Sequence, residues 1–474
     1  MKKQLWALWA VYLAAAAAMV LVFASRVSPV HSLLLGQYGG NAAADAMLIG
    51  KYWLEGALPY QDLFAVGGPL YFAVQAAGWF LGGRTGIMIL EIISLWIYLI
   101  FLHRTLELFA RKKQAICLTL LSLIPYMALC SGGNSPAEWC LPLCSIALFY
   151  TLRDVSGDGS FGKTQFILGL VCGAVLMLGF QHGGLLYGLA LFVLIQAGTQ
   201  KGIGGLGKAA FRMLCGAAVP LAFVLVCYAQ VDKGLLWKGG FLYAAKAWFG
   251  GFDSLNVILH KTVKCSLMAP LLAAAVYQIC KKERKLGICL LLGTLGTLFF
   301  LLLADNVWYN FIITMPCVSA AAAIFLGQDC RVCTRIGVSA CVVGMALICA
   351  IPLKNYAAYL FEGTPDVIEE FIVDFQSNRA EMPEAKILFL DTDSSYLLEL
   401  DEKPICRYFS NQTQLEAYGA DVSAQTAGYL DGGADLVVTT DRGWIGRELE
   451  NYVVTQVYCK IGGSVFIYIP YETV

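Results

Sequence analysis

Residues 41–70 read NAAADAMLIGKYWLEGALPYQDLFAVGGPL, and this stretch decides how the chain is interpreted. It follows a first apolar run and precedes a long series of others, so we expect it to form the first external loop of a membrane protein. It carries two aspartates, Asp45 and Asp62, and a Gly-x-x-Pro-Tyr-x-Asp turn leads into the second. Acids in such a loop indicate that the loop binds or activates a molecule at the membrane surface.

The amino-acid composition is that of a membrane protein. Hydrophobic residues make up 58% of the chain and charged residues only 14%, whereas an ordinary soluble domain is about 25% charged. A hydrocarbon core about 30 Å thick needs about 20 apolar residues per helix, and the chain has many such runs. The net charge is zero, and no basic stripe suggests nucleic acid as a partner. We therefore predict a polytopic α-helical membrane protein.

The number and direction of the spans follow from the basic clusters between the apolar runs. Lys and Arg concentrate in short cytoplasmic loops, and three clusters lie at residues 111–113, 281–285 and 331–335. All three are cytoplasmic only if the short run 66–82 is interfacial or re-entrant. This predicts about eleven transmembrane helices, a cytoplasmic N-terminus and an external C-terminus. If 66–82 crosses the membrane, the number of spans is about twelve.

The apolar runs are the expected transmembrane helices. A segment rich in aromatic and basic residues lies between two of them. Residues 232–263 mix aromatic and basic residues and predict an amphipathic interfacial helix with a glycine break. The apolar runs lie at about residues 5–25, 66–82, 87–108, 114–130, 138–151, 164–181, 184–199, 209–230, 264–280, 286–304, 308–327 and 333–353.

The composition becomes more polar from about residue 354, which predicts a second domain. AKILFL at 385–390, ADLVVTT at 434–440 and SVFIYI at 464–469 are typical of short buried strands, and residues 412–431 have a helical pattern between two of them. We therefore expect a transmembrane domain at 1–353 and a small extracytoplasmic α/β domain at 354–474. No glycine-rich phosphate loop precedes a helix in the second domain, so nucleotide binding is not predicted.

The chain has seventeen cysteines, and most of them lie inside apolar runs. A cysteine in such a run acts as a small buried hydrophobic residue. Two pairings stay open at the polar ends of the runs and in the tail, Cys130 with Cys140 and Cys406 with Cys459.

Three segments carry a resemblance to a known family. The first is Asp45 followed by GALPYQDLF at 56–64 and GPLY at 68–71. The second is GGNSPAE at 132–138, and the third and weaker one is WYNFIITMP at 308–316. Together they resemble the GT-C superfamily of integral-membrane glycosyltransferases, in the branch that contains protein-O-mannosyltransferases, aminoarabinose transferases and family-39-like bacterial enzymes.

The resemblance extends over about residues 1–150 and departs from the family pattern at two places. Residues 63–69 read LFAVGGP and lack the His or Lys that often follows the turn in the family. Glu138 stands alone where an adjacent pair of acids is common. Any role of that basic residue, or of a second acid, is therefore not carried over to this chain.

The resemblance implies an inverting transfer of a sugar from a polyprenyl-phosphate donor to an acceptor on the outer face of a bacterial plasma membrane. The acceptor would be a cell-envelope glycan, a lipid or a protein. An acceptor hydroxyl has a high pKa, so a carboxylate within hydrogen-bond reach must take its proton. Asp45 is the candidate for this general base.

Other residues of the matching segments are candidates for binding, each with a structural alternative. Asp62 and Glu138 would hold Mg²⁺ or Mn²⁺ through carboxylate oxygens, or stabilise a turn and a helix N-terminus. Tyr60 would stack on a sugar or anchor the turn. Lys51 would pair with the donor phosphate, or with Glu55 one helical turn away.

Four further polar residues stand in apolar surroundings. Asn134 belongs to the second matching segment and Tyr309 to the third, and both are candidates for donor or acceptor binding. His182, in a turn between two runs, would contact the phosphate or be incidental. Glu91 lies inside an apolar run, where acids are costly and usually functional.

Two other classes of membrane protein remain as alternatives. A transporter or flippase of lipid-linked sugars would carry an internal repeat and charges at mid-membrane. A polysaccharide polymerase or ligase of another fold would rely on external arginines and histidines. The acid-rich first loop favours the glycosyltransferase.

Overall fold

The computed structural model describes residues 2–24, 40–129, 133–157, 161–249, 269–280, 283–303, 309–327, 335–346, 349, 373, 375–377, 379–380, 382–392, 394–431, 433–439, 452–460 and 463–470. Several predictions from the sequence lie outside these residues. They include the domain boundary near 353, the disulfide partner Cys130 and the basic residue Arg331. Of the four cysteines in the two open disulfide pairings, Cys140 and Cys406 have described side chains, and both are free thiols.

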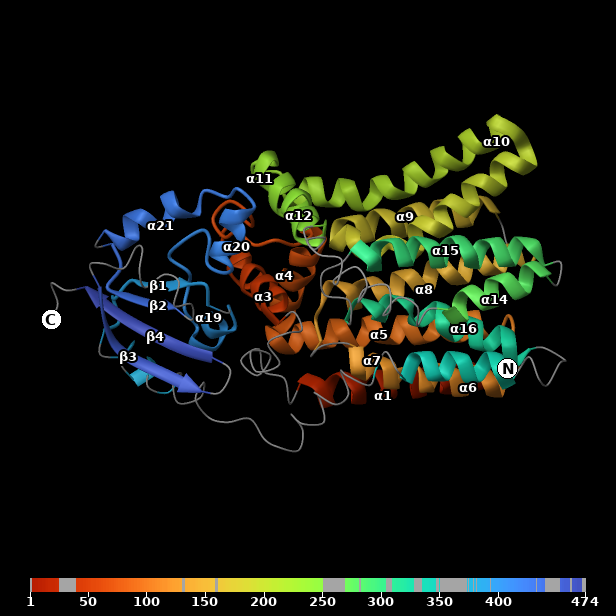
Figure 1. Cartoon of the computed structure of the whole chain (residues 1–474), viewed down its shortest axis with the longest axis horizontal. Helices are drawn as coiled ribbons and strands as arrows, with labels where there is room; N and C mark the ends of the chain where they lie inside the picture. The colour runs from red at the N-terminus through yellow and green to blue at the C-terminus, as the bar shows by residue number, and fades with distance from the viewer. Residues whose placement is uncertain are drawn as a thin grey trace.

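The molecule has two parts, a long helical bundle and a smaller part built around a sheet (Figure 1). The N-terminus lies at the end of the bundle that is remote from the sheet, and the chain ends on the sheet side. The helices of the bundle are α1 (Lys2–Ala24), α3 (Gly40–Leu54), α4 (Pro69–Gly82), α5 (Arg84–Leu106), α6 (Lys112–Leu121), α7 (Leu123–Leu129), α8 (Pro136–Val155), α9 (Phe161–Gly179), α10 (Gly184–Cys227), α11 (Lys233–Trp237), α12 (Tyr243–Phe249), α14 (Ala269–Cys280), α15 (Arg284–Leu303) and α16 (Met315–Leu326), with short turns η1 (Phe180–Gly183), η2 (Lys238–Leu242) and η3 (Tyr309–Thr314).

The apolar runs of the sequence form helices in the described parts of the chain. Within these parts, α5, α15 and the stretch 161–227 are long and apolar enough to cross a membrane. That stretch includes α10, which is divided by a kink at Gly202, where φ is +63°. A positive φ is readily adopted by glycine. The kink separates the two runs that the sequence places at 184–199 and 209–230.

Helix α4 corresponds to the run 66–82, which the sequence predicts to be interfacial or re-entrant. Its 14 residues extend about 21 Å, less than the ~30 Å hydrocarbon core. Gly82 and Gly83 both have positive φ and turn the chain directly into α5. The helices meet closely at this corner, because a Cβ added to Gly86 would lie 2.0 Å from the Gly78 carbonyl oxygen.

The segment between α10 and α14 is helical in its described half. Residues 233–249 form α11, the π-helical turn η2 and α12 in succession. The π-helical turn contains Gly239 and Gly240, and a Cβ on Gly239 would lie 2.4 Å from the Tyr60 ring. This agrees with the amphipathic helix with a glycine break that the sequence predicts, as far as residue 249.

The C-terminal part contains a four-stranded sheet in the order β1-β2-β4-β3. Strands β1 (Ile387–Leu390) and β2 (Leu436–Thr439) are parallel, and β4 (Gly463–Pro470) is antiparallel to both β2 and β3 (Tyr452–Lys460). Helices α19 (Ser395–Leu400), α20 (Gln412–Ala417) and α21 (Val422–Leu430) connect the parallel pair. The α/β alternation is therefore as expected, and β3 is a strand that the sequence did not predict.

The two parts are packed against each other near α3. Arg84, at the start of α5, binds Glu399 with an N–O distance of 2.7 Å. The Phe64 N–H donates to the Arg407 carbonyl at 2.9 Å, and the Phe64 ring lies 5.3 Å from Tyr408. Aromatic side chains of the first loop thus belong to the same core as the C-terminal part.

The basic residues 111–113 lie toward the opposite end of the bundle. Helix α5 begins at Arg84 beside the C-terminal part, and its 23 residues extend about 34 Å away from it. Residues 111–113 follow that far end. Gly327 approaches the same place, because a Cβ on it would lie 2.2 Å from the Phe109 carbonyl oxygen. The chain thus brings the residues before α6 and the end of α16 to one end of the bundle.

Candidate active site

The Gly-x-x-Pro-Tyr-x-Asp stretch forms a tight turn after α3. The Asp62 carboxylate accepts a hydrogen bond from the Leu58 N–H at 2.7 Å, a common way for Asp to stabilise a turn. Tyr60 has a positive φ of 66°, and its hydroxyl donates to the Gly67 carbonyl at 2.6 Å. The side chain of Asp62 is exposed, whereas Tyr60 is fully buried. The motif therefore shapes the loop.

Tyr60 is enclosed by other aromatic rings. Its ring centroid lies 5.2 Å from that of Phe72 and 5.9 Å from that of Tyr228. Burial raises the pKa of its phenol well above the usual value. Of the two roles expected for Tyr60, these contacts are those of an anchor for the turn.

Asp45 lies on helix α3 rather than in an irregular loop. The alanines around it are the strongest helix formers, and they extend the helix from Gly40. The Asp45 side chain is 5% exposed and accepts a hydrogen bond from the Ser394 hydroxyl of the C-terminal part. The candidate base is therefore held at the junction of the two parts.

Asn134 organises the second loop. It has a positive φ of 58°, which Asn tolerates better than most residues. Its side chain exchanges two hydrogen bonds with Gln75, at 2.7 and 2.9 Å, and accepts a third from the Trp139 indole N–H at 3.0 Å. Its carbonyl accepts the Tyr71 hydroxyl at 2.5 Å. Asn134 thereby links the start of α4 to the start of α8.

Glu138 closes a capping box at the start of α8. Its N–H donates to the Ser135 hydroxyl at 3.3 Å, and its Oε2 atom accepts from the Ser135 N–H at 2.8 Å. This satisfies two N-terminal amides of the helix, as the structural alternative for Glu138 predicts. The other carboxylate oxygen, Oε1, is buried and has no hydrogen-bond partner among the described residues. One half of the side chain thus caps the helix, and the carboxylate also lies within reach of the Tyr126 hydroxyl.

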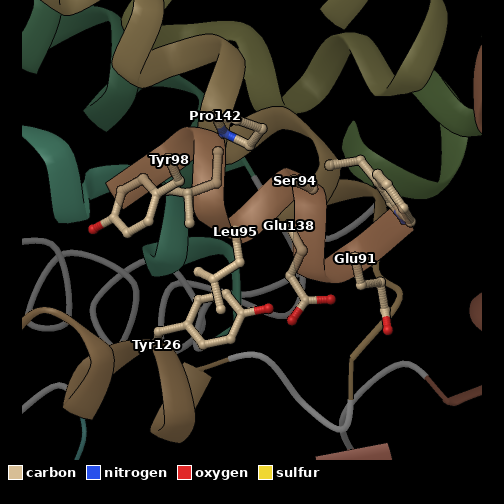
Figure 2. Close-up of a pocket in the computed structure, with 9 residues that line it drawn as sticks. Glu91, Ser94, Leu95, Tyr98, Tyr126, Glu138 and Pro142 are labelled. Atoms are coloured by element: carbon tan, nitrogen blue, oxygen red, sulfur yellow. The ribbon is translucent and has the colours of Figure 1, made fainter. Parts of the chain in front are cut away.

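Glu91 enters the same site from α5. Its carboxylate accepts the Asn134 N–H, and it lies near enough to Glu138 for the two charges to repel each other. Both acids line a small pocket, together with Tyr98, Tyr126 and hydrophobic residues. Figure 2 shows the Tyr126 hydroxyl beside the Glu138 carboxylate. The sequence singles out Glu91 as an acid within an apolar run, and the structure places it next to Glu138.

The charges of these two acids and of Asp45 all affect the same side chain, Tyr71. It is buried at the start of α4, and its phenol pKa is raised first by burial and then by the charges of Glu138, Glu91 and Asp45. Three carboxylates, from α8, α5 and α3, therefore act on one phenol. This group is the candidate active site, and it lies at the end of the bundle that faces the C-terminal part.

Three other candidates from the sequence lie elsewhere or make different contacts. Lys51 pairs with Asp401 of the C-terminal part rather than with Glu55, and its ammonium lies 4.7 Å from the Tyr52 ring centroid. His182 is buried in η1, with its ring 5.6 Å from Trp248 and its Nδ1 atom without a partner in the described residues. Tyr309 begins η3.

Asp62 and Glu138 are the two candidate metal ligands, and each has one carboxylate oxygen in a local hydrogen bond. The described residues contain no group of three or more His, Cys, Asp and Glu side chains that could hold a metal ion. Carboxylate oxygens suit Mg²⁺ or Mn²⁺, which prefer oxygen ligands.

Sequence reasoning missed the residues that connect the candidate acids. Gln75 lies in an apolar run, and a lone buried amide there was the available signal. Ser394 lies 349 positions from Asp45, and no local pattern relates the two. Tyr71 belongs to the quoted GPLY segment, but nothing in that segment indicates that the charges of three acids raise the pKa of its phenol.

The architecture, with a helical bundle, three acid-bearing helices that meet at one end and a C-terminal α/β part, is a GT-C-like fold. Two solved structures of ArnT from Cupriavidus metallidurans have this fold over nearly the whole chain. The form described as bound to undecaprenyl phosphate aligns with a TM-score of 0.63 and 12% identity, covering 97% of this chain and 98% of that one. The apo form aligns with a TM-score of 0.52 and 14% identity, covering 99% and 98%.

Sequence comparisons contribute a narrower match. The competence-induced Ccs4 N-terminal domain family matches residues 14–231, which extend from α1 past the end of α10. None of the curated proteins matches the chain. The similarity to ArnT, at this low identity, establishes the fold, as the resemblance in the loops predicts.

Proposed function

We propose that the chain is a membrane glycosyltransferase of the GT-C type. It moves a sugar from a polyprenyl-phosphate donor to an acceptor on the outer face of a bacterial plasma membrane, with inversion at the sugar carbon. The observation that carries the proposal is the set of acids at one end of a GT-C-like fold, with Asp45 at the junction with the C-terminal part and Glu91 and Glu138 on one pocket. The undecaprenyl phosphate in the ArnT structure supports a lipid phosphate as the donor carrier.

In this proposal Asp45 is the general base. Its carboxylate takes the proton of the acceptor hydroxyl while the sugar carbon leaves the lipid phosphate. That phosphate is already a good leaving group, so a single base suffices. Glu138 binds Mg²⁺ or Mn²⁺ or a donor hydroxyl, and Asn134 holds this loop in place. Lys51, Asp62, His182 and Tyr309 complete the proposed donor and acceptor surroundings, and Tyr60 anchors the turn between them.

We also propose the orientation in the membrane. The N-terminus and the basic segments at the far end of the bundle face the cytoplasm, as the distribution of Lys and Arg favours. The active site and the C-terminal domain then lie outside the cell membrane, within the cell envelope. The acceptor, a glycan, a lipid or a protein, is reached from that side.

The experiment compares wild type with Asp45→Asn in lipid, using a panel of polyprenyl-phosphate sugars and a membrane extract as acceptor. A general base contributes about 10²- to 10⁴-fold, so we expect Asp45→Asn to lose at least about 100-fold in transfer while it still binds the donor. The matched control is Glu55→Gln, which removes an exposed acid at the end of the same helix. Equal transfer by Asp45→Asn and wild type would remove Asp45 from the role of base. A wild type that binds no donor would favour the transporter or flippase.

A further inference from the structure

The C-terminal domain reaches the candidate base directly. The Ser394 hydroxyl donates a hydrogen bond to Oδ1 of Asp45. Ser394 is 0% exposed and Asp45 is 5% exposed, so the contact is shielded from water. In such surroundings a hydrogen bond to a carboxylate is stronger than at the surface. The contact joins two residues from different domains of the chain.

The segment that carries Ser394 is fixed by three further polar contacts. Arg84 donates to Glu399 at 2.7 Å and to the Leu398 carbonyl at 3.2 Å. At the end of α19, Asp401 pairs with Lys51, which lies on α3 together with Asp45. Charged groups of opposite sign therefore face each other on both sides of the junction. The hydroxyl of Ser394 is presented to Asp45 by a segment that is itself held in place.

A carboxylate base works only if its oxygen points at the proton it removes. An aspartate side chain rotates about two bonds, and a misplacement of about 1 Å can cost about 100-fold in rate. A hydrogen-bond donor on one carboxylate oxygen restricts this rotation. It thereby also fixes the direction of the second oxygen. The Ser394 hydroxyl is such a donor.

We propose that Ser394 is a positioning residue for Asp45, and that the C-terminal domain thereby completes the active site. The inference rests on the proposed function, in which Asp45 is the base. It gives the C-terminal domain a part in the reaction rather than only in binding an acceptor. Ser394 acts through Asp45 and has no contact of its own with the reacting atoms in this proposal.

The test measures transfer kinetics for Ser394→Ala and Ser394→Thr in the same lipid and with the same donor as wild type. We expect Ser394→Ala to lower kcat about 10- to 100-fold with KM nearly unchanged, because the base is misplaced while the substrate surfaces are intact. Ser394→Thr keeps the hydroxyl and should recover most of the activity. The matched control is Ser423→Ala, which removes a serine-to-carboxylate hydrogen bond, to Glu416, inside the C-terminal domain.

A double variant separates positioning from a general structural effect. If Ser394 acts through Asp45, then Ser394→Ala added to Asp45→Asn causes no further loss of the residual transfer. Ser394→Cys, of similar size with a weak donor, replaces Ser394→Ala if that variant does not fold, and thermal unfolding in lipid checks each variant. Normal kinetics of a folded Ser394→Ala or Ser394→Cys, or additive losses in the double variant, would overturn the proposal while the glycosyltransferase stands. No transfer by wild type would instead refute the proposed function.

Discussion

A single amide side chain connects α4 to the start of α8, the helix that carries Glu138. Asn134 satisfies the buried polar groups of Gln75 and Trp139 with three hydrogen bonds. Its positive φ of 58° also sets the direction in which the chain enters α8. The residue therefore has two separable roles, one of the side chain and one of the backbone.

Substitution of Asn134 is expected to separate these roles. Asn134→Gly keeps a backbone that accepts positive φ and removes the hydrogen bonds, leaving buried polar atoms unsatisfied at about 1–3 kcal/mol each. Asn134→Ala loses the same bonds and adds about 1–2 kcal/mol for the left-handed conformation. Thermal unfolding in lipid should therefore rank wild type above Asn134→Gly and Asn134→Gly above Asn134→Ala. An Asn134→Gly variant as stable as wild type would show that the network contributes nothing.

The residues of the candidate site differ in how well the sequence reveals them. Asp45 and Glu138 lie in quoted loop segments, and Glu91 is an acid in an apolar run. The contacts that give these acids their surroundings are long-range, such as Ser394 with Asp45. The partner of Lys51 shows the same limit, because the i,i+4 rule favours Glu55 and the fold supplies Asp401.

At the level of elements, the corner between α4 and α5 fixes where the first loop meets the bundle. The two helices are joined by Gly82 and Gly83, and they meet at Gly78 and Gly86 without side chains between them. A Cβ on Gly86 would lie 2.0 Å from a backbone oxygen, which cannot move away as a flexible side chain would. Since α4 carries Tyr71 and α5 carries Glu91, the angle between the two helices sets the position of these two side chains relative to each other.

Gly86→Ala is therefore expected to destabilise the protein by about 1–3 kcal/mol, the usual cost of overpacking. A glycine-to-alanine change elsewhere in a helix should do the opposite, because alanine is favoured by about 1 kcal/mol. Gly207→Ala is the matched control, since a Cβ there meets nothing within 4 Å. Thermal unfolding of both variants in lipid decides the point. If Gly86→Ala were as stable as Gly207→Ala, the close corner would not be a constraint.

The elements themselves follow from the sequence to different degrees. The apolar runs predict the long helices, and the Ile, Leu and Val runs at 387–390 and 436–439 predict β1 and β2. Strand β3 was missed because its sequence, YVVTQVYCK, mixes polar and apolar residues, and its pairing with β4 depends on tertiary context. The expected loop around Asp45 is a helix because its alanines favour one.

At the scale of the whole molecule, the C-terminal part covers the end of the bundle where the acids lie. It is attached there by the main-chain contact of Phe64, the pairs of Lys51 and Arg84, and the hydrogen bond to Asp45. Partly exposed ion pairs contribute only about 0–1 kcal/mol each. Removing one pair should therefore loosen the junction slightly, whereas reversing one charge adds repulsion and should loosen it more.

Charge reversal at the Arg84–Glu399 pair tests this attachment. Arg84→Glu faces a like charge across the junction, so hydrogen exchange in α3 and α19 should become faster than in wild type. Arg84→Glu combined with Glu399→Arg restores opposite charges and should return exchange toward the wild-type rate. Glu402→Gln is the control, because Glu402 pairs with Arg379 inside the C-terminal domain and should leave α3 protected. If the double reversal exchanges as fast as Arg84→Glu alone, the pair does not hold the domains together, and the attachment depends on the buried contacts of Phe64 and Asp45.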